Sequence, residues 1–194
     1  MVRPDGAPAA GPGRQADRFS CGPAVLLVTA AMLTARGTAP GAGPTATTGP
    51  DGSARSAGRA PHGASPPAGS AGTADAQRAA HRQANLIWPR LLGTTPWGMR
   101  AWLRRTAPGR YRIRPATPAA LRRAAATGLP VPVLVGSALL PRHWVLLLGT
   151  AADGRWRVYE PGAGTVRTCA PGLRAPGVAR ELGWPRPWGV LLPV

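Results

Sequence analysis

The sequence has no lysine, only two cysteines, one phenylalanine and seven acidic residues. With Cys21 and Cys169 alone, a disulfide framework is excluded, although a single bridge between the two stays open. The two Cys and three His residues do not stand at the spacing of a zinc site, which excludes a zinc site of the usual kind. We therefore expect neither a metal nor any other cofactor.

Long hydrophobic runs are absent as well. The longest, Ala24–Leu33, falls well short of the about 20 apolar residues that cross a bilayer. The N-terminal residues 1–6 lack the apolar segment of a secretory signal. These observations predict a cytoplasmic protein without a membrane segment.

Most of the charged side chains are basic. Arginine supplies all 24 basic side chains, against 7 acidic ones, for a net charge of +17. A strongly basic chain can bind nucleic acid. The arginines are dispersed, however, and form no basic tail, and a chain rich in Arg, Ala, Gly and Pro is also typical of a GC-rich genome. We expect no specific nucleic-acid partner, and an Arg-rich nucleic-acid binder remains the weakest of three functional hypotheses.

The 194 residues suit one domain with flexible segments. Residues 1–14 are rich in Pro, Gly and Ala, and residues 38–73 consist almost wholly of Gly, Ala, Pro, Ser and Thr. Such segments lack the apolar pattern whose burial would offset their ordering entropy. We expect a flexible N-terminus over 1–14 and one domain over 15–194, interrupted by a low-complexity insertion at about 38–73.

The domain is organised around a helix that Cys21 begins. Pro23 suits a first helical turn, the following residues are apolar on nearly every side, and Gly37 is placed to end the helix. A helix that is hydrophobic all round is buried. Cys21 should therefore lie at the N-terminus of a central buried helix, where the helix dipole favours a thiolate. A free cysteine in such a place can also be an ordinary small core residue.

Helices are expected first and strands afterwards. Three further helices should begin near the caps Asp75 (to about Trp88), Thr95 and Thr117. Strands are expected over 111–113, 131–135, 143–149, 155–160 and 188–193. This order predicts an α+β domain, with the N-terminal helix packed on an antiparallel sheet from the C-terminal third.

One histidine and one carboxylate stand out on those strands. His62 falls in the insertion and His81 in an Arg-rich helix, whereas His143 begins an apolar strand. The period of two along 155–160 places Glu160 on the same face as Trp156, where a buried carboxylate needs a partner. His143 would satisfy that need, although His143 as a strand cap and Glu160 in solvent are the plainer alternatives.

The hairpin geometry bears on this pair. A four-residue loop, Ala151 to Gly154, would place Glu160 opposite Val145, diagonal to His143 and on its face. We therefore predict that loop, a bond from the Glu160 carboxylate to one ring nitrogen of His143, and Cys21 facing the other nitrogen.

Several further motifs accompany these residues: Gln15-x5-Cys21-Gly22-Pro23-Ala24, Arg142–Val145, Val158–Pro161 with Gly164, Gly93–Met99 and Leu129–Val133. Together they resemble the C39-like branch of the papain-like cysteine peptidases. The resemblance implies a papain-like fold with Cys21 as nucleophile, His143 as base and Gln15 in the oxyanion hole. The third catalytic member of the family is normally Asp, and Glu160 occupies that position here.

The leading functional hypothesis is a cysteine peptidase that cleaves peptide or protein substrates through an acyl-thioester. The alternative is a non-catalytic papain-like module that binds a peptide or a partner protein in the same cleft.

Overall fold

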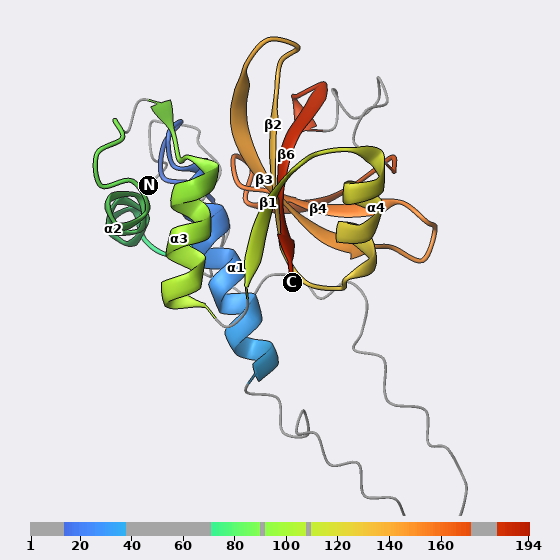
Figure 1. Cartoon of the computed structure of the whole chain (residues 1–194), viewed down its shortest axis with the longest axis horizontal. Helices are drawn as coiled ribbons and strands as arrows, with labels where there is room; N and C mark the ends of the chain where they lie inside the picture. The colour runs from blue at the N-terminus through green and yellow to red at the C-terminus, as the bar shows by residue number, and fades with distance from the viewer. Residues whose placement is uncertain (1–13, 38–70, 90–91, 108–109, 172–181) are drawn as a thin grey trace, which may run out of the picture.

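The computed structural model describes residues 14–37, 71–89, 92–107, 110–171 and 182–194 (Figure 1). Residues 1–13 of the expected flexible N-terminus and most of the expected insertion lie outside the described residues, whereas Arg14 is described and hydrogen-bonded to Gln77 and Gly162. Within them, the elements are α1 (Cys21–Gly37), α2 (Ala74–Ala84), α3 (Pro96–Thr106), β1 (Tyr111–Pro115), α4 (Pro118–Ala126), β2 (Val131–Gly136), β3 (Pro141–Thr150), β4 (Trp156–Glu160), β5 (Thr165–Cys169) and β6 (Arg186–Pro193).

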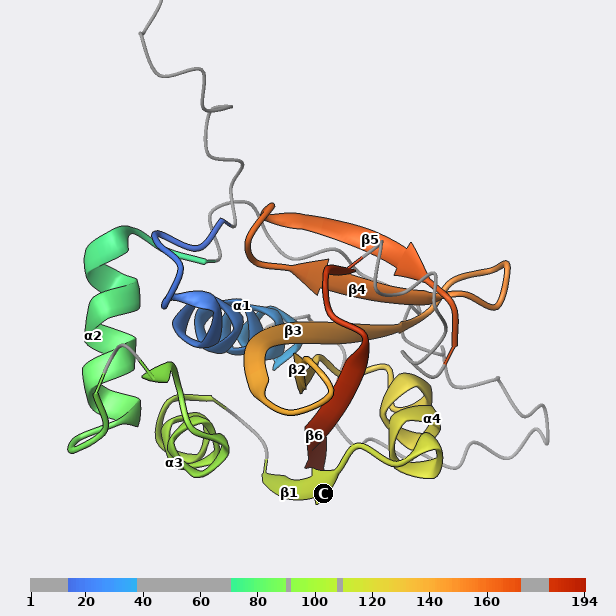
Figure 2. The ribbon, with the colours of Figure 1, turned by 90° about the horizontal axis from the view of Figure 1, so that it is seen from above.

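The six described strands form one antiparallel sheet in the order β1-β6-β2-β3-β4-β5. Helices α1 and α3 pack on one face, with α2 outside them, and α4 covers the opposite face (Figures 1 and 2). The α+β class and the packing of α1 on the sheet are thus confirmed. The sheet is larger than expected, because β1 from the middle of the chain joins it at one edge.

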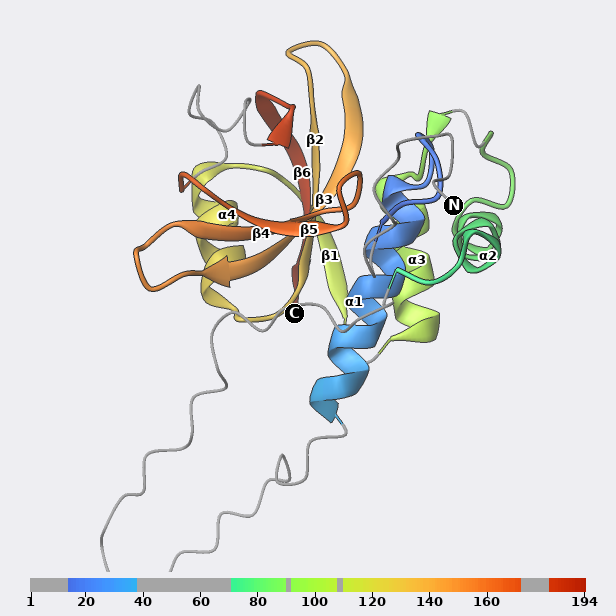
Figure 3. The same cartoon turned by 180° about the vertical axis from the view of Figure 1, so that it is seen from behind.

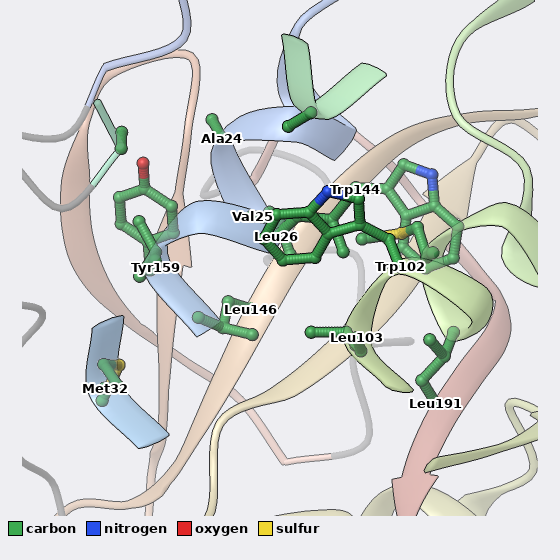
Figure 4. Close-up of a cluster of buried hydrophobic side chains, with 14 of the residues drawn as sticks. Ala24, Val25, Leu26, Met32, Trp102, Leu103, Trp144, Leu146, Tyr159 and Leu191 are labelled. Carbon is green, nitrogen blue, oxygen red and sulfur yellow. The ribbon is translucent and has the colours of Figure 1, made fainter. Parts of the chain in front are cut away.

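Strand β3 is buried on both faces, which explains its continuous apolar sequence. Trp144 and Leu146 face α1 and α3, and Figure 4 shows them beside Val25 and Leu26 of α1. Val145 and Leu147 point instead into the second core, under α4. Each face of the central strand therefore has its own hydrophobic cluster, and α1 is held against β3 by the first of them.

Helix boundaries follow local capping. Thr95 and Thr117 cap α3 and α4 as predicted, each accepting a bond from the N–H three residues on. The predicted cap at Asp75 is wrong, because Thr73 Oγ1 accepts the Ala76 N–H and Asp75 lies inside the first turn.

The predicted extension of that helix to about Trp88 is also wrong, since α2 ends at Ala84. Asn85 leaves the helix and its side-chain oxygen accepts the N–H of Thr95, which joins the end of α2 to the start of α3. The boundary of the insertion moves too, because Ala71 is buried in the first core and Thr73 caps α2.

The loop between β3 and β4 differs from the predicted one, but the predicted pairing of Glu160 with Val145 is kept. Thr150 pairs with Trp156, so the four-residue loop is wrong. The register then shifts by one between Leu147 and Gly149, so that Leu146 lies opposite Tyr159. Continued by one residue, that register places Val145 opposite Glu160, the predicted pairing. A β-bulge, rather than the loop, supplies the extra residue.

The last strand pair was not anticipated. Residues 165–169 pair with β4 as the edge strand β5, and Cys169 is the buried last residue of that strand. The most apolar helix, α1, has 17 residues, and none of the described helices has the length and hydropathy for crossing a bilayer.

Candidate active site

Cys21 is the first residue of α1, as predicted, and only 3% of its surface is exposed. The preceding loop is folded around Asp17, whose carboxylate accepts the Phe19 N–H and the Ser20 hydroxyl, each at 2.9 Å. Ser20 then accepts the Ala24 N–H through its carbonyl at 2.9 Å, which starts the helix. The loop thus fixes the thiol at a helix N-terminus, where unpaired N–H groups favour negative charge.

His143 and Glu160 form the predicted pair. The Nε2 atom of His143 lies 2.7 Å from Oε1 of Glu160, and the two side chains are 11% and 12% exposed. His143 stands near the start of β3 and Glu160 at the end of β4, on strands that pair directly. With Nε2 engaged, Nδ1 is the ring nitrogen left for a second partner.

The Cys21 thiol acts on the same imidazole. Burial by itself lowers the pKa of His143, but hydrogen bonds with Cys21 and Glu160, together with their negative charge, outweigh burial and raise the pKa to about 9. The imidazolium is therefore the favoured form at neutral pH. A cationic ring between a thiol and a carboxylate is the arrangement in which a cysteine becomes nucleophilic.

The turn after β4 holds the Glu160 carboxylate in place. Its Oε1 accepts the Gly162 N–H at 2.9 Å and its Oε2 accepts the Ala163 N–H at 2.7 Å. Burial by itself raises the pKa of this carboxyl, but the bonds from His143, Gly162 and Ala163 together lower it below its usual value. The carboxylate is therefore ionised and aimed at the imidazole.

Trp184 completes the surroundings of the histidine, and sequence reasoning missed it. Its ring stacks on His143 at a centroid distance of 5.9 Å and an interplanar angle of 25°. Trp184 precedes β6, the strand next to β2 in the sheet, so only the tertiary fold brings it to the histidine. The ring therefore covers one side of the imidazole, whose side chain is 11% exposed.

Gln15 is in the loop ahead of α1, but its amide is partly engaged there. The Nε2 donates to the Asp17 carbonyl at 2.8 Å, which leaves one amide N–H for another acceptor. Its backbone N–H donates to the Pro161 carbonyl at 2.7 Å. The loop that carries Gln15 is thus tied to the turn that holds Glu160.

A buried glutamine on α2 anchors this loop, again missed from the sequence. Gln77, 1% exposed, accepts the Ala16 N–H at 2.8 Å and donates to the carbonyls of Arg14 at 3.0 Å and Ala71 at 3.1 Å. Arg14 in turn donates through Nε to the Gly162 carbonyl. Hydrogen bonds therefore run from α2, through the loop ahead of Cys21, to the turn beside Glu160.

Steric crowding explains why the residue after Cys21 is a glycine. A Cβ atom at Gly22 would lie 2.4 Å from Thr94 Oγ1. The carbonyl of Thr94 accepts the Trp144 Nε1–H at 2.8 Å, which joins the segment before α3 to β3. Only glycine at position 22 lets that segment approach the start of α1.

The four predicted residues are therefore not equivalent in the structure. Cys21, His143 and Glu160 form a connected set, with His143 in the middle. Gln15 is held in the loop beside them, with part of its donor capacity used locally. Signals for Gln77 and Trp184 were absent from the sequence, because each acts through contacts with residues distant in the chain.

Comparison with known proteins adds no relative to this description. No family model matches the chain, and a search of curated proteins found no significant match.

Proposed function

We propose that the protein is a papain-like cysteine peptidase of the C39-like kind, which cleaves peptide or other amide bonds through an acyl-thioester. The observation that carries the proposal is the buried 2.7 Å hydrogen bond between His143 and Glu160, beside a thiol at a helix N-terminus that raises the pKa of the same histidine. A nucleophile at a helix N-terminus, a base in contact with it and a carboxylate that orients the base are the parts that covalent amide hydrolysis needs.

The proposed reaction has two stages. The Cys21 thiolate attacks the substrate carbonyl carbon, and the resulting oxyanion is stabilised by the Cys21 backbone N–H and the remaining amide N–H of Gln15. The C–N bond then breaks as the His143 imidazolium gives its proton to the leaving amine. Water, deprotonated by the neutral imidazole, attacks the thioester and releases the acid and the thiolate.

Glu160 has a positioning role in this scheme. Its bond to Nε2 fixes the orientation of the imidazole and leaves Nδ1 for the thiol, and its charge stabilises the imidazolium. Glutamate is longer than the aspartate usual in the family, and the Gly162 and Ala163 N–H groups hold its carboxylate at hydrogen-bond distance from the ring.

One observation favours a second candidate, a papain-like module that binds a peptide or partner protein without cleaving it. The Gln15 Nε2 donates to Asp17 within its own loop. If that bond holds the remaining Gln15 N–H away from the oxyanion, the oxyanion has one donor fewer, and loss of one such donor lowers turnover by about a hundredfold or more.

Covalent labelling tests the nucleophile on which the peptidase proposal depends. We expect an electrophilic epoxide to modify Cys21, with the adduct located by mass spectrometry, and to do so much faster than it modifies Cys169. Cys169 is a matched control because it is also buried, with its thiol donating to the Trp156 carbonyl. Labelling of Cys21 should be abolished in Cys21→Ala and slowed at least about tenfold in His143→Ala. Equal rates at the two cysteines in the parent protein would refute the peptidase proposal.

A further inference from the structure

Among the described residues, the large apolar side chains outside the site are most exposed in two places. Leu86 and Ile87, after α2, are 89% and 98% exposed, and Leu139, in the turn between β2 and β3, is 88% exposed. Together with Leu92, Trp97 and Leu140 they make up what we call the apolar rim. Single exposed apolar residues are ordinary, but a group of large ones marks an interaction surface.

The two parts of the apolar rim lie at the same end of the molecule. The α2–α3 connection and the β2–β3 turn both stand at the end where α1 begins (Figures 1 and 3). Trp88 and Trp97 brace the first part, with ring centroids 6.1 Å apart and an edge-to-face angle of 84°. Separate projections at one end of a molecule can touch a flat surface together.

Basic side chains accompany each part of the rim. Arg78 and Arg82 line a hollow of about 500 Å³ next to Leu86 and Trp88. Arg186, near the second part, donates to the Ala138 carbonyl in the β2–β3 turn. The sequence has no acidic residue between Asp75 and Asp153, and Asp75 pairs with Arg78. The partner of this surface should therefore be both apolar and negatively charged.

We propose that this end of the molecule docks on an anionic lipid bilayer. Leu and Ile side chains enter the boundary of the acyl chains, tryptophan suits the interface, and arginine binds lipid phosphate. A peptide ligand would be enclosed by a groove, whereas Ile87, Leu92 and Leu139 do not line the hollow beside Leu86. The docking does not depend on the chemistry proposed for Cys21.

Vesicle co-sedimentation of the full chain tests the proposal. The probes are phosphatidylcholine vesicles with and without one quarter phosphatidylglycerol. A chain of charge +17 will adsorb to anionic vesicles at low salt whatever its surface, so the decisive measurement is made at about 0.5 M NaCl, where charges are screened within a few ångström. We expect binding to the anionic vesicles to persist there and to fall at least about tenfold in Leu86→Ser/Ile87→Ser.

Two pairs of arginine variants separate local from general charge. Arg78→Gln/Arg82→Gln removes two charges beside the apolar rim, and Arg122→Gln/Arg123→Gln removes two exposed charges from α4, across the sheet. The first pair should weaken binding severalfold more than the second. Equal effects of the two pairs, or unchanged binding of Leu86→Ser/Ile87→Ser, would overturn the proposal.

The serine variant should keep the parent fold because both side chains are almost wholly exposed, and circular dichroism checks this. A second outcome that overturns the proposal is concentration-dependent self-association that Leu86→Ser/Ile87→Ser abolishes, with no vesicle binding at high salt. The apolar rim would then be an interface between copies of this chain.

Discussion

His143 and Glu160 are joined by a 2.7 Å hydrogen bond between Nε2 and Oε1, in a position where both side chains are nearly buried. The bond links the middle member of the proposed catalytic set to the residue in which the chain departs from the family it resembles. Glu160 therefore offers the most direct test of how the set works.

Glu160→Gln should lower turnover about ten- to a hundredfold, because the neutral amide no longer stabilises the imidazolium. Glu160→Asp keeps the charge but moves the carboxylate back by one methylene, so its effect should be smaller. The measurement is the rate of Cys21 labelling, or of peptide hydrolysis once a substrate is known, with the fold checked by circular dichroism. Parent-like rates in both variants would mean that Cys21 and His143 act without the carboxylate.

Gly162 should be intolerant of a methyl group for a reason that concerns the site rather than the fold. A Cβ atom there would lie 3.0 Å from Glu160 Oε1 and 3.1 Å from Oε2, which is tight enough to displace the carboxylate. We expect Gly162→Ala to slow Cys21 labelling severalfold with a change in unfolding free energy below about 1 kcal/mol. Gly37→Ala is the matched control, because a Cβ there meets nothing within 4 Å. The idea fails if both variants label at the parent rate.

The pH dependence of stability follows from the two shifted groups. The pKa of His143 is raised from 6.5 to about 9, so its contribution is complete below pH 6.5 and is lost as the pH rises toward 9. The pKa of Glu160 is lowered from 4.5, so its contribution is complete above pH 4.5 and is lost as the pH falls through its folded pKa. The melting temperature should therefore be highest between these limits.

A comparison with Glu160→Gln isolates this effect. The substitution removes the carboxylate that helps to raise the pKa of His143 and whose own pKa is lowered. The parent should lose unfolding free energy on the order of a few kcal/mol between pH 6.5 and 9, and the variant clearly less. Thermal melts of both proteins across that range provide the measurement. If the melting temperatures of both proteins fell in parallel with rising pH, the His143–Glu160 pair would not be the cause of the loss of stability at alkaline pH.

Gln77 should act as a positioning residue for the loop ahead of Cys21. Gln77→Met removes three hydrogen bonds to Arg14, Ala16 and Ala71 at similar volume, and should cost about 2–3 kcal/mol of unfolding free energy. It should also slow Cys21 labelling under conditions where the variant is fully folded. A purely structural role would lower stability and leave that rate unchanged.

The matched control for Gln77 is on the same helix. Gln83→Met loses one bond, from the Trp102 indole N–H, on a side chain that is exposed. It should destabilise the protein less and leave the labelling of Cys21 at the parent rate.

The sequence by itself determined the features that depend on neighbours in the chain. The start of α1 at Cys21, the caps at Thr95 and Thr117 and the alternation of β4 each arise from groups within about one turn or one strand. Such signals do not decide between two neighbouring residues that can each cap a helix. For this reason Asp75 was predicted as the N-cap of α2, whereas Thr73 occupies that position. The residue types at positions 21, 143 and 160 could be identified as a candidate set for the same reason, since their chemistry is visible in the sequence.

The tertiary structure alone decided how those residues meet. The register that brings Glu160 to His143 depends on a bulge in β3 between Leu147 and Gly149, and a bulge follows from packing on both faces of the sheet rather than from a local motif. Gln77 contributes through a hydrogen bond with Ala16, 61 residues away in the chain. Trp184 contributes through its stacking on His143. Contacts of that kind form only when the whole core is assembled, because their free energy must offset the entropy of closing long loops.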